Sequence, residues 1–107
     1  MNDSFPTPQS EIYSVFEFAL ATLPNGMPRQ SVQNIGEFDS IEEAFAAALA
    51  RARSEAVLLA GVFAALPGVE SGDPLVGIFA TEWGYDIRHE QQTITRLWIH
   101  SHSGGDE

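Results

Sequence analysis

The chain has 107 residues with no cysteine and no lysine, and its fifteen acidic residues against five arginines give a formal net charge of −10. This length fits a single domain, and the missing residue types exclude disulfides, thiolate metal ligands, a cysteine nucleophile and lysine Schiff-base chemistry. The charge disfavours binding to nucleic acid or anionic membranes and favours a basic protein partner through electrostatic steering.

The two ends of the chain are polar. Residues 1–10 carry two prolines and predict a disordered or loosely docked tail, residues 11–101 predict one domain, and residues 102–107 predict a polar C-terminal tail. The start shows no signal-peptide pattern, and the longest uncharged run, residues 56–69, is too short to span a bilayer. We therefore expect a cytoplasmic protein.

Residues 11–23 are rich in aromatic and β-branched side chains. Both alternating faces of this segment are substantially apolar, which predicts a central strand rather than an edge strand. Pro24, Asn25 and Gly26 then predict a turn, because proline fixes φ and the next two residues tolerate positive φ. Residues 29–38 predict a weaker, more exposed strand that pairs with the first.

Residues 39–66 predict one long helix. Ser40 and Glu43 have the spacing of a capping box, and apolar residues follow at three- and four-residue steps. Residues 56–66 carry no charge, so their pattern fits either a helix or a buried strand. On the other side of the helix lie small residues that either form a subunit interface or are buried within the monomer. We assign to the interface Ala47, Ala50, Ser54, Gly61 and Ala65.

After a loop over residues 67–74, residues 75–87 predict an apolar strand in which Gly84 marks a bulge. Residues 93–100 predict the last strand. The resulting order is strand, strand, helix, strand, strand, which predicts an α+β fold. In it, an antiparallel sheet of about four strands in ββαββ order carries one long helix on one face, and its uncovered face favours self-association.

Two groups of residues are candidate ligand sites. A pocket between helix and sheet would be lined by Phe16, Phe18, Glu82, Trp83, Tyr85 and Trp98, and Glu82 or Asp86 would be the general base of an enzyme that uses it. Alternatively, these rings belong to the core or to an interface, and the carboxylates point to water. His100 and His102 lie on one side of an extended segment, and two histidines with a carboxylate can bind zinc or iron. The same H-x-H spacing is common in solvated polar tails. No phosphate-binding, dinucleotide-binding, zinc-protease or nucleophile-elbow motif occurs.

The sequence therefore favours a small acidic protein that is not an enzyme, needs no cofactor and acts through protein–protein contacts. We expect a homodimer that regulates or neutralises a basic partner. The partner would contact the acidic residues around the helix start, which are Glu37, Asp39, Glu42 and Glu43. The alternative for this cluster is that it caps the helix and faces solvent. The alternative is a small-ligand-binding protein or enzyme that uses the aromatic pocket.

Overall fold

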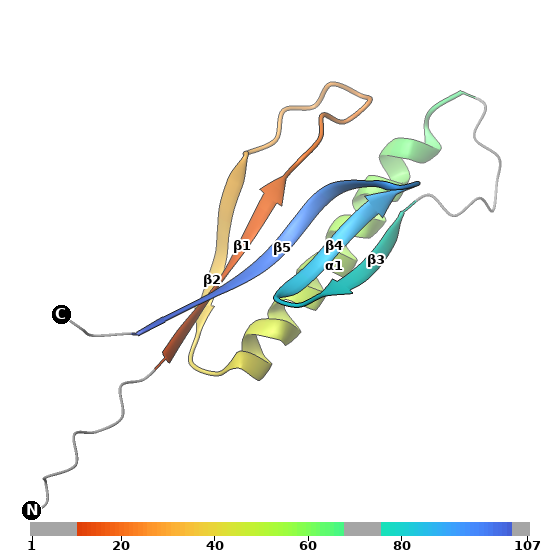
Figure 1. Ribbon diagram of the computed structural model, residues 1–107. Coiled ribbons are helices and arrows are strands. Elements are labelled where there is room, and N and C mark those ends of the chain that lie inside the picture. The colour runs from red at the N-terminus through yellow and green to blue at the C-terminus, as the bar shows by residue number, and fades with distance from the viewer. Residues whose placement is uncertain (1–10, 68–75, 104–107) are drawn as a thin grey trace, which may run out of the picture.

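The computed structural model describes residues 11–67 and 76–103, which form a five-stranded antiparallel sheet and one long helix (Figure 1). In chain order the elements are β1 (Glu11–Ala19), β2 (Val32–Phe38), α1 (Ile41–Ala64), β3 (Gly77–Thr81), β4 (Gly84–His89) and β5 (Gln92–Ser103). Across the sheet the strands run β2-β1-β5-β4-β3. The predicted α+β class with one antiparallel sheet and one helix is confirmed.

The prediction of about four strands in ββαββ order is wrong, because residues 75–87 form two strands instead of one. The chain turns at Glu82 and Trp83, so that Thr81 in β3 pairs with Gly84 in β4. Gly84 has a φ of 154°, a conformation that side chains rarely permit, and a Cβ there would lie 1.9 Å from the carbonyl oxygen of Leu97. The glycine that suggested a bulge therefore allows a hairpin.

The helix begins as its capping sequence predicts. The Ser40 hydroxyl accepts a hydrogen bond from the backbone N–H of Glu43 at 3.1 Å, which satisfies one of the free donors of the first turn. The helix continues to Ala64, so residues 56–64 are helical and the strand alternative does not apply to them. Its buried residues face the sheet: Ala44, Ala48, Ala52, Leu59 and Phe63.

The core lies between α1 and one face of the sheet. β1 and β5 pair over nine residues, from Glu11 opposite Ser103 to Ala19 opposite Thr95. Alternate residues of these strands face the helix, and the core side chains from the sheet include Val15, Ile87, Leu97 and Ile99. Burying one such side chain stabilises the fold by about 1.5–3 kcal/mol.

The strand boundaries differ from the expected ones by a few residues. β1 ends at Ala19 rather than residue 23, and β5 continues to Ser103, two residues beyond the predicted domain. The predicted tail of residues 1–10, most of the predicted loop and residues 104–107 lie outside the described residues. No helical segment in the described ranges combines the length and the apolar character needed to cross a membrane.

Candidate functional site

The sheet has one face packed on α1 and one face turned away from it, which we call the open face. Figure 1 shows α1 behind the sheet, and within residues 11–67 and 76–103 no other helix or strand covers the side away from it. The register of β1 and β5 places Phe16 opposite Trp98 and Phe18 opposite Arg96 on this side. Their neighbours in sequence, Val15 and Leu97, are buried against the helix side.

Aromatic side chains make up much of the open face. The ring centroids of Phe16 and Phe18 are 6.4 Å apart, and 45% of the surface of Phe79 is exposed. A shallow hollow of about 320 Å³ is lined by Phe18, Leu20, Arg96 and Trp98. These rings are only partly buried, so the monomer leaves apolar surface in contact with water.

A buried carboxylate lies in β4 on the same face, opposite Phe79. Asp86, which is 2% exposed, accepts hydrogen bonds from Nε of Arg96 at 2.8 Å and from its Nη2 at 3.1 Å. The hydrogen bond to Asp86 raises the pKa of Arg96 above its ordinary value. Arg88 approaches the same carboxylate at 3.8 Å and places its guanidinium 4.7 Å from the centroid of the Phe79 ring. These two arginines outnumber the one aspartate.

The structure separates the residues of the predicted pocket. Phe16, Phe18 and Trp98 lie on the open face, whereas the Tyr85 ring lies on the helix side, 6.2 Å from Phe45. The other two predicted residues, Glu82 and Trp83, lie in the turn between β3 and β4. The six residues therefore do not line one pocket between helix and sheet. Trp83 and Trp98 do line a hollow of about 170 Å³, together with His100.

His100 and His102 are exposed near the end of β5. Both face the open side, opposite Ser14 and Ile12 of β1, and their ring centroids are 5.7 Å apart. Nε2 of His102 lies 3.3 Å from the Ser14 hydroxyl. Over the described residues, no group of three or more histidine, cysteine, aspartate or glutamate side chains gathers as a metal site would require. Within the described residues, the predicted metal site therefore consists of His100 and His102, and no third ligand of these types joins them.

The predicted small-residue interface lies on the outer side of α1. Ala50, Ser54, Gly61 and Ala65 are exposed and Ala47 is half-buried. The same side carries Val57 and Leu58, which are 77% and 56% exposed. A Cβ built on Gly61 would meet nothing within 4 Å. We call this surface the outer helix stripe.

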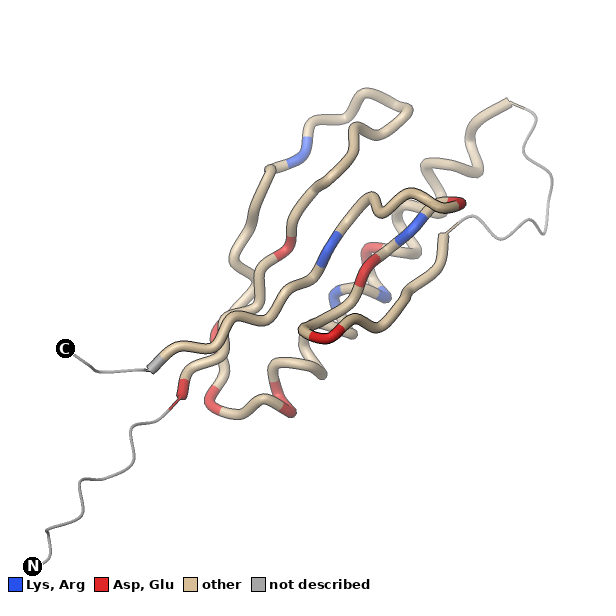
Figure 2. Tube along the Cα trace, viewed as in Figure 1, with Lys and Arg blue, Asp and Glu red and all other residues tan. Residues whose placement is uncertain are grey.

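The acidic residues around the helix start are all exposed: Glu37, Asp39, Glu42 and Glu43. Figure 2 shows acidic segments in red gathered at the end of the molecule where α1 begins. Glu42 and Glu43 lie in the first turn of α1, where the helix dipole stabilises negative charge. We call this region the acidic end.

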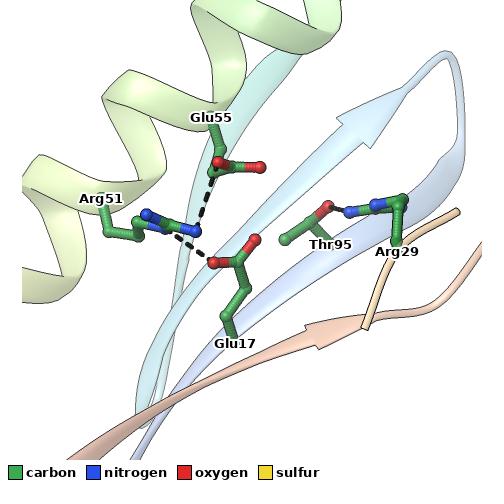
Figure 3. Close-up of polar contacts among 5 residues, drawn as sticks. All are labelled: Glu17, Arg29, Arg51, Glu55 and Thr95. Carbon is green, nitrogen blue, oxygen red and sulfur yellow. Dashed lines mark hydrogen bonds and ion pairs between the residues drawn. The ribbon is translucent and has the colours of Figure 1, made fainter. Parts of the chain in front are cut away.

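A second charged cluster, which the sequence did not predict, joins α1 to β1 (Figure 3). Nε of Arg51 donates to Oε1 of the buried Glu17 at 2.7 Å, and Nη2 of Arg51 lies 3.5 Å from Oε2 of Glu55. Near it, Arg29 donates hydrogen bonds to three neutral acceptors, the carbonyl oxygens of Ala21 and Ile94 and the Thr95 hydroxyl. The spacing of Arg51 and Glu55 suggests a helix pair, but nothing local connects Arg51 to Glu17, which lies 34 residues earlier.

The pKa of Glu55 is raised, first by burial and then by repulsion from Glu17. The folded protein holds the proton of the Glu55 carboxyl more tightly than the unfolded chain does. The stability of the fold therefore falls as the pH rises from 4.5 through the pKa of Glu55 in the folded protein. We expect Glu55→Gln to be more stable than the native protein at neutral pH, with the difference closing below pH 4.5.

Urea unfolding at both pH values measures this effect, and Glu90→Gln is the control because Glu90 lies in the exposed turn between β4 and β5. A Glu55→Gln protein that is less stable at neutral pH would show that attraction to Arg51 outweighs burial and repulsion.

Comparisons with known proteins give no family for this chain: no family model matches it, and no curated protein or solved structure matches it either. A functional assignment therefore depends on the surfaces described above, which are the open face, the outer helix stripe and the acidic end.

Proposed function

We propose that the protein is a non-enzymatic, cytoplasmic interaction protein that forms a homodimer and binds a basic protein, whose activity it regulates or neutralises. The open face supports this proposal most. Its partly exposed rings Phe16, Phe18 and Trp98 lie on the adjacent strands β1 and β5, and Phe79 lies on the same face of β3, beyond β4. Extended apolar surface of this kind on a small protein marks an interaction site.

The distribution of charge supports a basic partner at a different place. The acidic end combines Glu37, Asp39, Glu42 and Glu43 in exposed positions, in a chain whose net charge is −10. Complementary charge accelerates the encounter of two proteins and disfavours partners of the same sign. The acidic end would therefore contact the partner, while the aromatic surface remains available for self-association.

The ligand-binding or enzymatic alternative receives less support from the geometry. Of the two predicted general bases, Glu82 is exposed in a turn and Asp86 is held by two hydrogen bonds from Arg96. Tyr85 lies on the opposite side of the sheet from Trp98. The shallow hollow beside Phe18 and Trp98, of about 320 Å³, only reaches the roughly 300 Å³ at which ordinary small-molecule pockets begin, and the hollow beside Trp83 and Trp98, of about 170 Å³, is smaller. A ligand in this hollow would contact His100 as its polar group.

Charge reversal tests the proposed partner site. The full-length protein, immobilised and exposed to host lysate, is expected to retain basic proteins that are released by raised salt. Glu42→Lys is expected to reduce their capture at least severalfold, because it replaces attraction by repulsion at the acidic end. Mass spectrometry identifies and quantifies the captured proteins.

Glu90→Lys is the matched control, because it changes the net charge equally in the exposed turn between β4 and β5. If the retained proteins are not basic, or if both variants lose them equally, the acidic end is not a specific binding site.

A further inference from the structure

We infer that a second copy of this chain covers the open face, so that two sheets pack face to face in the homodimer. This inference rests on the proposed function and specifies which surface the dimer uses. It differs from the expectation based on sequence, which placed the interface on the small residues of the outer helix stripe.

The size of the open face suits a stable dimer. The nine residues of β1 extend about 30 Å at a rise of 3.4 Å per residue, and five strands about 4.8 Å apart span roughly 20 Å. The sheet therefore presents a projected area of about 600 Å², and protruding rings increase the accessible area toward the ~800 Å² per partner of a standard interface. The outer helix stripe is narrower, because it is a single row of residues on one helix.

The chemistry of the face also suits sheet-on-sheet packing. Two sheets pack about 10 Å apart, with the side chains of their facing surfaces interdigitated. Phe16, Phe18 and Trp98 occupy the central strand β5 and its neighbour β1, and Phe79 lies on the same face of the edge strand β3, beyond Asp86 of β4. Aromatic residues of this kind supply much of the binding energy of protein interfaces.

The charges on the face favour a second copy over the basic partner. Glu37 of β2 lies opposite Ser14 and so belongs to the open face, which carries Glu37 and Asp86 against Arg88 and Arg96. These four side chains have a net charge of zero in a chain of −10. A basic protein would gain no net attraction here, whereas a second copy would meet an equally apolar face without repulsion between net charges.

The inference is tested on the full chain by analytical ultracentrifugation over a range of concentrations. We expect a species of twice the 11.7 kDa chain mass. Phe18→Thr is expected to raise the dimer dissociation constant at least about tenfold, as loss of a well-packed interface ring does, and Phe79→Thr is expected to raise it by a smaller factor, because Phe79 lies at the edge of the sheet. Threonine is favoured in strands, so both substitutions preserve the strand. Phe79 lies on an edge strand, so Phe79→Thr still tests the interface if Phe18→Thr unfolds the protein.

Leu58→Gln is the matched control, because it removes an exposed apolar side chain from the outer helix stripe and keeps a good helix former. It is expected to leave the dissociation constant unchanged. A dimer weakened by Leu58→Gln but by neither phenylalanine variant would overturn the inference and move the interface to the helix, with the proposed dimer intact. A native protein that stays monomeric at every concentration would overturn both the inference and the proposed dimer, and would leave the open face to residues 1–10 or to another protein.

Discussion

Gly84→Ala is expected to destabilise the protein by more than about 3 kcal/mol, or to prevent folding. The new Cβ would lie 1.9 Å from the Leu97 carbonyl oxygen, which is backbone and cannot rotate away, and the φ of 154° strains any side chain. The hairpin of β3 and β4 would have to shift away from β5. Chemical denaturation, or the yield of folded protein where the variant does not fold, measures the loss.

Gly61→Ala makes the same chemical change with the opposite expected result. Gly61 lies inside α1, where nothing would meet the added methyl within 4 Å, and alanine is favoured over glycine in a helix by about 1 kcal/mol. We therefore expect a more stable protein. If Gly84→Ala and Gly61→Ala lose similar stability, the close contact and the φ of Gly84 do not make that position especially sensitive. A Gly61→Ala dimer of unchanged affinity would also fit an interface away from the helix.

Arg96→Met is expected to cost about 1–3 kcal/mol, because it leaves the buried Asp86 carboxylate without its main hydrogen-bond donor, although the Arg96 side chain itself is 42% exposed. Asp86 would lose both hydrogen bonds from Arg96 and keep only Arg88, at 3.8 Å. Methionine retains much of the apolar length of the arginine side chain, so most of the lost stability comes from the hydrogen bonds that the Asp86 carboxylate no longer accepts. Urea unfolding at one fixed protein concentration measures it.

Two further variants separate the ion pair from general effects. Arg53→Met, on the exposed side of α1, is expected to change stability by no more than about 0.5 kcal/mol. Adding Asp86→Leu to Arg96→Met should recover part of the loss, because an apolar pair avoids burying charge. An Arg96→Met protein as stable as Arg53→Met would show that Asp86 does not depend on this partner.

The sequence predicted the elements whose signals are local. The Ser40 cap and the three- and four-residue apolar steps predicted α1, and alternating apolar residues predicted β1 and β5. The turn at Glu82 and Trp83 could not be predicted, because those residues are not typical of turns and Gly84 also fits a bulge. The hairpin depends on how closely the Leu97 backbone approaches Gly84, which is a tertiary contact.

The candidate surfaces were predicted less well. The alternation of β1 could not show which of its two apolar faces the helix covers, so Phe16 and Phe18 were assigned to a pocket beneath α1. The cluster of Glu17, Arg51 and Glu55 joins segments that are distant in sequence, and no periodicity signals such a pair. The acidic end was recognisable because its residues are close together along the chain.

The pairing of β1 with β5 also constrains synthesis on the ribosome. The N-terminal strand is made first, and its inner edge lacks a partner until the residues up to Ser103, which pairs with Glu11, have been translated. During that interval β2 and α1 can protect only part of β1, and an apolar strand edge is prone to aggregation. Closing the sheet across most of the chain is also slow, because contacts between distant residues cost loop entropy. In a nascent chain, β1 would therefore keep one unpaired edge until β5 has left the ribosome.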